Sequence, residues 1–92
     1  MAYQVLIVDD DSAIRELLRE FLAEEGLTTR EAASKAEAYE VMEDTDPDLM
    51  LLDMWLPDGD GLDVLDSLRG RSEIPVIVIT ADSSSSRTIR AM

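Results

Sequence analysis

Short apolar runs alternate with stretches of helical period along this chain of 92 residues. The runs are Val5–Val8, Leu49–Leu52 and Val76–Ile79, and a polar residue follows each of them. Strands that are buried on both faces, as in the centre of a parallel sheet, have this uninterrupted apolar composition. The pattern therefore predicts three central strands of a parallel sheet.

Three amphipathic stretches predict helices between these strands. The first carries an apolar stripe at helical spacing and stops before Gly26; the stripe consists of Ile14, Leu17, Leu18, Phe21 and Leu22. The second begins at Ser34, which forms the S-x-x-E pattern of a capping box with Glu37, and ends before Pro47. The third follows Gly61 and carries leucines at helical spacing. Each helix is long enough to connect two parallel strands.

The order of these elements predicts the fold class. The segment from Leu27 to Ala32 is polar and contains threonine, which favours a strand at the edge of the sheet. Strands and helices then alternate as β-α-β-α-β-α-β, and Ser83 to Met92 is interpreted as the first turns of a fourth helix. This alternation is typical of right-handed βαβ crossovers in a doubly wound α/β parallel sheet. We expect one domain over residues 1–92, without an internal repeat or a linker.

Composition excludes several kinds of chemistry. The chain has no histidine and no cysteine, so it offers no imidazole base, thiolate or Cys-rich zinc site. Eight Lys and Arg residues against 21 Asp and Glu give a net charge of −13, the wrong sign for binding nucleic acid. Its apolar runs are far shorter than the ~20 residues that span a membrane, and the start of the chain lacks a signal peptide's basic residues. We therefore expect a cytoplasmic protein that binds cations or basic protein surfaces.

The residues that end the apolar strands are candidates for a binding site. Asp9 and Asp10 follow the first run, Asp53 follows the second and Thr80 follows the third. In an open α/β sheet, ligands bind beyond the carboxyl ends of the strands, so these side chains should converge. A group of like charges needs a cation, and Mg²⁺ fits better than Ca²⁺ because few protein oxygens are offered. The neighbouring Asp11 is expected only to cap the first helix.

Carboxylates beside a magnesium ion suit attack on a phosphorus centre. Asp53 is the predicted nucleophile because it ends a central strand and precedes a loop, rich in proline and glycine, that leaves its carboxylate accessible. The hydroxyl of Thr80 would donate a hydrogen bond to a phosphoryl oxygen. The small side chain of Ala81 would leave space for the phosphoryl group.

Three motifs in the same order resemble the receiver domains of two-component response regulators, which have a flavodoxin-like, CheY-like fold. They are Val5–Asp11 with its acidic pair, Asp53–Gly61 with the pattern D-x-x-[ML]-P-x-x-x-G, and Pro75–Ala81. The resemblance implies that a histidine kinase or a His-phosphotransfer protein phosphorylates Asp53. It also implies that Asp9, Asp10, the Asp53 carboxylate and the backbone carbonyl of Trp55 bind Mg²⁺, and that Thr80 is the switch hydroxyl.

Receiver domains of this family continue beyond the length of this chain. The comparison predicts a domain that is incomplete at its carboxyl end and lacks the fifth strand, the fifth helix and the family's phosphate-neutralising lysine. Val76–Ile79 would then be an edge strand, and an exposed apolar edge invites pairing with another chain. We expect a homodimer through this strand and the last helix segment. In the alternative, the remaining residues fold back over the edge.

Three functions fit these features. The first is a phosphoacceptor module of a two-component phosphorelay, which is not an enzyme and signals through a change of surface. The second is a truncated receiver-like scaffold that dimerises and no longer switches. The third is a magnesium-dependent hydrolase, which is disfavoured because Trp55 stands where such an enzyme has a second catalytic aspartate.

Overall fold

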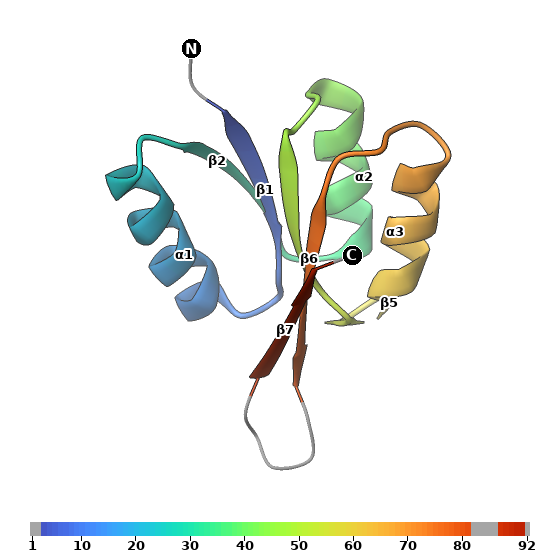
Figure 1. Ribbon diagram of the computed structural model, residues 1–92. Coiled ribbons are helices and arrows are strands. Elements are labelled where there is room, and N and C mark those ends of the chain that lie inside the picture. The colour runs from blue at the N-terminus through green and yellow to red at the C-terminus, as the bar shows by residue number, and fades with distance from the viewer. Residues whose placement is uncertain (1–2, 82–86, 92) are drawn as a thin grey trace.

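Four parallel strands and one antiparallel strand form a single sheet in the computed structural model, which describes residues 3–81 and 87–91. The sheet has the order β2-β1-β3-β6-β7 (Figure 1). Its strands are β1 (Gln4–Val8), β2 (Thr28–Ala32), β3 (Leu49–Asp53), β6 (Val76–Ala81) and β7 (Arg87–Ala91). The first four strands are parallel and follow the predicted doubly wound arrangement, with the polar β2 at one edge.

Helices cover both faces of this sheet. Helix α1 (Ser12–Glu24) lies on one face, and α2 (Lys35–Asp44) and α3 (Gly61–Arg69) lie on the other (Figure 1). Two very short strands, β4 (Trp55–Leu56) and β5 (Gly59–Asp60), form a hairpin between β3 and α3. The three predicted helices are confirmed, whereas the hairpin was predicted as a loop.

Local hydrogen bonds explain where the first two helices begin. The side chain of Asp11 accepts hydrogen bonds from the N–H groups at the start of α1, which confirms its predicted capping role. The Ser34 side chain accepts from the N–H of Glu37 at 3.1 Å, and the Glu37 carboxylate accepts from the N–H of Ala33 at 2.8 Å. The first bond is that of a capping box, whereas the reciprocal bond is shifted by one residue, to Ala33 in place of the N-cap Ser34. After α1, Gly26 adopts a φ of 81°, which suits glycine.

The core consists of two layers, one on each side of the sheet. Leu6, Val8, Met50 and Leu52 face α2 and α3, whereas Val5, Ile7, Leu51 and Ile79 face the side of α1. Adjacent residues of one strand therefore enter opposite layers, as alternation along a strand requires. This arrangement explains why the central strands are apolar at every position.

Helix α1 covers its face of the sheet only in part. None of its residues is buried, and the exposed fractions of Leu17 and Phe21 are 63% and 59%. Leu18 and Leu22 pack against the sheet. The apolar stripe predicted from the sequence therefore has an inner edge in the core and an outer edge in solvent.

The structure corrects the prediction for the end of the chain. Residues 87–91 form the antiparallel strand β7, whose Ile89 pairs with Ile79 of β6, and not the predicted helix. The rest of the predicted helix, residues 83–86 and 92, lies outside the described residues. A helix of ten residues is marginal in isolation, whereas a strand beside β6 satisfies the hydrogen-bonding groups of an apolar edge. The sheet thus has a fifth strand, although not a parallel one.

The structure does not meet the premise of the predicted dimer interface. That interface required an unpaired edge on Val76–Ile79, but β7 pairs with β6 from Ile77 to Ala81. The chain itself therefore occupies the edge that a second copy was expected to use, as the alternative interpretation had it. In the part of the chain that the structure describes, no helix is long and apolar enough to cross a membrane.

Candidate metal centre

Two buried carboxylates lie at the carboxyl edge of the central strands. Asp9 follows β1 directly and Asp53 is the last residue of β3, and the register pairs Val8 with Leu52. The two aspartates therefore reach the same level of the sheet. Their exposed fractions are 0% and 2%, and they are the buried charged residues among those described. Burial of two carboxylates so close together is costly unless other groups stabilise them.

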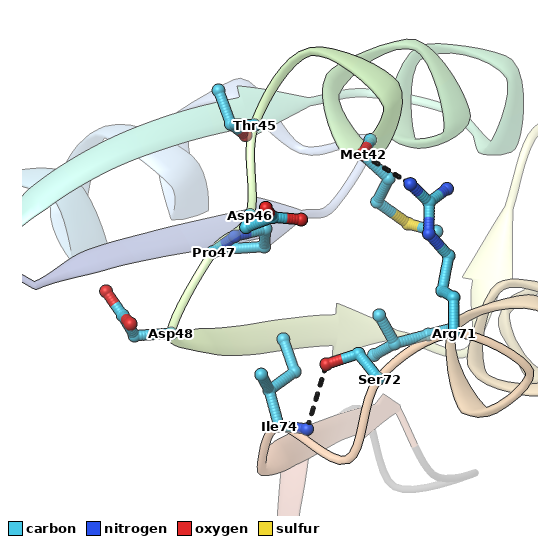
Figure 2. Close-up of a pocket in the computed structure, with 9 residues that line it drawn as sticks. Met42, Thr45, Asp46, Pro47, Asp48, Arg71, Ser72 and Ile74 are labelled. Carbon is cyan, nitrogen blue, oxygen red and sulfur yellow. Dashed lines mark hydrogen bonds between the residues drawn. The ribbon is translucent and has the colours of Figure 1, made fainter.

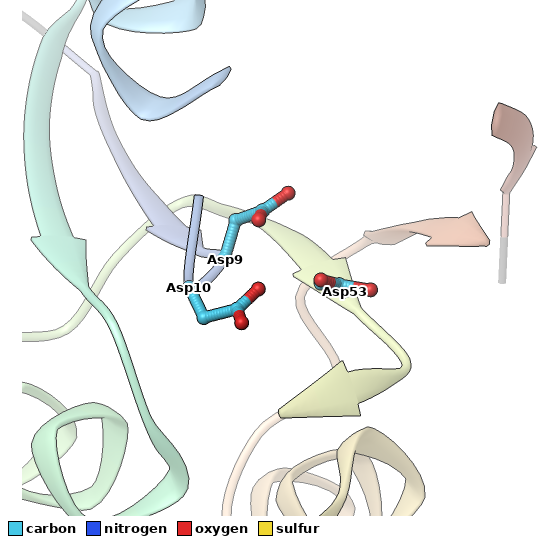
Figure 3. Close-up of side chains that lie close together, drawn as sticks. All are labelled: Asp9, Asp10 and Asp53. Atoms are coloured by element: carbon cyan, nitrogen blue, oxygen red, sulfur yellow. The ribbon is translucent and has the colours of Figure 1, made fainter. Parts of the chain in front are cut away.

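A third carboxylate completes the group. Asp10 is exposed, and one carboxylate oxygen from each of Asp9, Asp10 and Asp53 lies within 4.8 Å of the others. Figure 3 shows the three side chains directed into one space beyond the strand ends. Opposite ligands of a magnesium octahedron are about 4.2 Å apart, given bonds of about 2.1 Å. Neighbouring ligands of the same octahedron are about 3.0 Å apart, so modest side-chain movement around an ion would bring three oxygens that lie within 4.8 Å of one another into its coordination shell. The residues therefore fit a magnesium ion.

Backbone groups orient the two buried carboxylates. An Asp9 oxygen accepts a hydrogen bond from the N–H of Asp11 at 2.9 Å, and an Asp53 oxygen accepts from the N–H of Trp55 at 3.1 Å. The backbone carbonyl of Asp9 accepts from the Arg15 guanidinium at 2.7 Å. Hydrogen bonds of this kind restrict the rotation of a carboxylate. The N–H groups of Asp11, which caps α1, and of Trp55 in β4 thus help to orient the site.

The segment after Asp53 is more ordered than the open loop that the sequence predicted. In the β4–β5 hairpin Trp55 pairs with Asp60, and the N–H of Gly61 donates to the carbonyl of Met54 at 2.9 Å. A Cβ atom on Gly61 would collide with the backbone carbonyl oxygen of Asp53 and lie 2.9 Å from Cα of Met54. The glycine therefore lets the start of α3 pack directly on the residue that ends β3.

The positions of Thr80 and Ala81 are defined by their backbone alone. Ile79 pairs with Asp53 across β3 and β6, so Thr80 follows the residue beside the central carboxylate. Both residues belong to β6 and pair with β7. Their side chains lie outside the described part of the structure, so their predicted contacts with a phosphoryl group stay predictions.

A cluster beside the hairpin was missed by the sequence analysis. Lys35, the only lysine of the chain, donates to the carboxylate of Asp63 at 2.7 Å. The carboxylate of Asp58 accepts from the N–H groups of Lys35 and Ala36 at 2.8 and 3.0 Å. The hydrogen bond to Asp63 raises the pKa of Lys35, and the two N–H donors lower the pKa of Asp58. The proline and glycine on either side of Asp58 indicated a turn, but nothing in the sequence indicated its helix partner.

A separate cavity of about 400 Å³ lies at the amino ends of the central strands, away from the three carboxylates (Figure 2). Asp48 and Ile74, which line it, precede β3 and β6. The Arg71 guanidinium donates to the carbonyl of Met42 at 3.1 Å, and the Ser72 hydroxyl accepts from the N–H of Ile74 at 3.2 Å. Both polar side chains therefore serve local packing. The cavity contains none of the predicted site residues.

Comparison with known proteins places the chain in a family. Residues 5–92 match the family model described as the response regulator receiver domain. The chain belongs to the response regulator receiver domains. The receiver domain is 42% identical over 88 residues to the KDP operon transcriptional regulatory protein KdpE of Escherichia coli, an alignment that covers 96% of this chain and 39% of KdpE. It therefore spans about two fifths of that relative's length.

Solved structures agree with the fold of this receiver domain. A response regulator receiver domain protein (CheY-like) from Methanospirillum hungatei matches with a TM-score of 0.83 and 31% identity, over 90% of this chain and 67% of that one. The BeF3-activated N-terminal receiver domain of Klebsiella pneumoniae RstA matches with a TM-score of 0.80 and 29% identity, over 87% and 68% of the two chains. The flavodoxin-like fold expected from the sequence is confirmed.

Proposed function

We propose that this receiver domain is a magnesium-dependent phosphoacceptor of a two-component phosphorelay and that Asp53 is the residue phosphorylated. The observation that carries the proposal is the position of three carboxylates within 4.8 Å at the carboxyl edge of the sheet, two of them buried. A domain does not gain stability by burying like charges together, so the arrangement indicates a cationic ligand. Membership of the receiver family supports the same role.

The proposed metal ligands are the carboxylates of Asp9, Asp10 and Asp53 and the backbone carbonyl of Trp55. A bound Mg²⁺ would offset the negative charge of the carboxylates and of an incoming phosphoryl group. Four protein oxygens leave positions for water and for a phosphoryl oxygen, as magnesium requires. Asp53 ends its strand beside the other ligands, and because it is only 2% exposed, a phosphodonor would have to reach a nearly buried carboxylate oxygen.

The proposed reaction is transfer of a phosphoryl group from a phosphohistidine to Asp53. A carboxylate oxygen of Asp53 attacks phosphorus, the P–N bond of the donor breaks, and its electron pair stays on the departing imidazole. The product is an acyl phosphate. The chain contains no histidine, so the donor belongs to another protein, a histidine kinase or a His-phosphotransfer protein. The Thr80 hydroxyl would then donate to a phosphoryl oxygen, beside the small Ala81.

The proposed output is a shift between two surface conformations, set by the phosphoryl group. KdpE is named a transcriptional regulatory protein, which makes control of transcription the proposed output of this receiver domain as well. The strongly acidic chain does not itself suit DNA binding, so that step would belong to a separate domain or protein.

A receiver-like scaffold that binds Mg²⁺ without switching is the second candidate. One observation favours it: the only lysine of the chain is engaged by Asp63 beside α2 and α3, and not by the carboxylate group. The resemblance to receiver domains assigns a lysine to the neutralisation of the phosphoryl group. Lys35 is the only lysine among these 92 residues, so these residues alone offer the phosphoryl group no such partner.

Phosphorylation by a small-molecule phosphodonor separates the two candidates. The protein is incubated with acetyl phosphate and Mg²⁺, and intact mass spectrometry should show the addition of one phosphoryl group. Asp53→Asn should abolish the gain, whereas Asp66→Asn, which changes an exposed residue of α3, should retain it. Beryllofluoride, the ligand named for the RstA receiver, should bind in the same way and give a spectral change that Asp53→Asn abolishes. Magnesium binding without any mass gain would refute the phosphoacceptor and favour the scaffold.

A further inference from the structure

The tip of the β4–β5 hairpin is attached to a helix that is distant in sequence. Asp58, in the turn of the hairpin, accepts hydrogen bonds from the first two N–H groups of α2, those of Lys35 and Ala36. These N–H groups have no partner within a helix. The local cap, Ser34, accepts from the N–H of Glu37 instead. Asp58 therefore acts as a second cap on α2, supplied from the segment that follows Asp53.

A lysine contact reinforces this attachment. The Lys35 ammonium crosses the hairpin beside Gly59 and reaches Asp63 in the first turn of α3. A Cβ atom on Gly59 would lie 2.8 Å from that nitrogen, and the φ of Gly59 is 147°. The backbone of this turn therefore favours glycine, and the lysine side chain lies close against it. The hairpin is held between the amino ends of α2 and α3.

The base of the hairpin adjoins the metal centre. The N–H of Trp55 donates to the Asp53 carboxylate, and Gly61 packs on the backbone carbonyl of Asp53. The hairpin consequently contacts the proposed phosphoacceptor at its first strand, and the residue that follows its second strand packs on the same aspartate. A displacement of the tip would be passed to the base beside Asp53 through the two paired strands between them.

From this geometry we infer that Asp58 is a positioning residue for the metal centre: its bonds to α2 hold the hairpin so that the Trp55 carbonyl and the Asp53 carboxylate present a preformed site to Mg²⁺. The inference rests on the proposed function and deepens it. Its physical basis is that a ligand held in place in advance costs less conformational entropy on binding than one that the ion must order. Asp58 does not bind the metal itself.

Two alanine variants that each remove a cap of α2 separate positioning from general stability. Asp58→Ala removes the cap that comes from the hairpin, and Ser34→Ala removes the local cap and leaves the hairpin attached. Asp58→Asn retains one acceptor oxygen without the charge. Asp66→Ala removes an exposed charge of α3 that accepts no side-chain hydrogen bond among the described residues, and it controls for net charge. Circular dichroism would confirm that each variant is folded.

Magnesium affinity is the principal measurement, by isothermal titration calorimetry and by the emission of Trp55, the only tryptophan. Loss of a group that orients a ligand typically weakens metal binding by 10–100-fold, and we expect about tenfold for Asp58→Ala. Ser34→Ala and Asp66→Ala should bind within about twofold of wild type, and Asp58→Asn should lie between these values. Hydrogen exchange at the Trp55 amide should accelerate in Asp58→Ala and not in Ser34→Ala.

Two results would overturn the inference while leaving the proposed function intact. One is wild-type magnesium affinity in Asp58→Ala, and the other is an equal loss in Ser34→Ala, which would assign the effect to the stability of α2. A wild-type protein that does not bind Mg²⁺ would instead refute the proposed function together with the inference.

Discussion

Substitution of Gly61 by alanine tests how tightly α3 packs on the metal centre. The added Cβ atom would collide with the carbonyl oxygen of Asp53 and approach Cα of Met54 to 2.9 Å. These are backbone atoms at the end of a buried strand, and they cannot turn away as a flexible side chain could. Either the start of α3 or the end of β3 must shift.

Two opposing effects set the expected magnitude. Overpacking of a dense core costs about 1–3 kcal/mol, and the upper end applies here because the obstacle is backbone. Alanine gains about 1 kcal/mol over glycine within a helix, and Gly61 is the first residue of α3. The expected net loss is about 2 kcal/mol in the free energy of unfolding. In a domain of this size that corresponds to a decrease of about 8–16 °C in Tm.

Gly70→Ala is the matched control, since it adds the same methyl group at the other end of the same helix. Its Cβ atom would meet nothing closer than 3.5 Å, and the residue has right-handed helical angles. We expect Gly70→Ala to be neutral or to gain about 0.4–1 kcal/mol through a less flexible unfolded chain. Urea denaturation of both variants measures the difference. If Gly61→Ala unfolds within about 0.5 kcal/mol of Gly70→Ala, the packing of α3 on Asp53 is refuted.

Three further results are expected. The pKa of Asp58 is lower in the folded protein than its usual 3.8, so its carboxylate stabilises the fold above pH 3.8 and loses this effect as the pH falls through the folded-state pKa. Asp58→Asn should therefore be less stable than wild type in urea denaturation at pH 6, and the difference should shrink at more acidic pH. A magnesium titration should shift or quench the emission of Trp55, and Asp9→Asn should weaken this response by at least about tenfold; flat wild-type emission would count against the site. Alternate N–H groups of an antiparallel strand point to its neighbour, so either Thr88→Pro or Ile89→Pro should remove a donor from the β6–β7 pairing. That variant should self-associate in sedimentation velocity. If both variants sediment as wild type does, the pairing is contradicted.

The apolar and polar pattern was sufficient to predict most of the fold. Four-residue apolar runs identified the central strands because only strands covered on both faces tolerate apolar residues at every position. A second rule predicted that Asp9 and Asp53 would meet: residues that end adjacent parallel strands lie at one edge of the sheet. Asp11 and Ser34 cap helices through bonds to residues two or three positions away, so those roles were readable locally.

Features that depend on distant partners were not predictable in this way. Residues 87–91 were interpreted as helix because the local pattern allows it, but an unpaired edge on β6 makes the strand more favourable. The bonds of Asp58 to α2 join residues more than twenty positions apart, and no local pattern distinguishes them from solvent exposure.

The sequence alone determined the class of fold, the acidic chemistry of the strand ends and the absence of an internal phosphohistidine, because these follow from composition and from periodicities of two to four residues. Only the tertiary structure decided how the edge of β6 is covered, how the segment after Asp53 is held, and which charges are buried. Those outcomes depend on which backbone groups find partners once the sheet has formed, and the free energy of such pairing belongs to the assembled fold and not to any local segment.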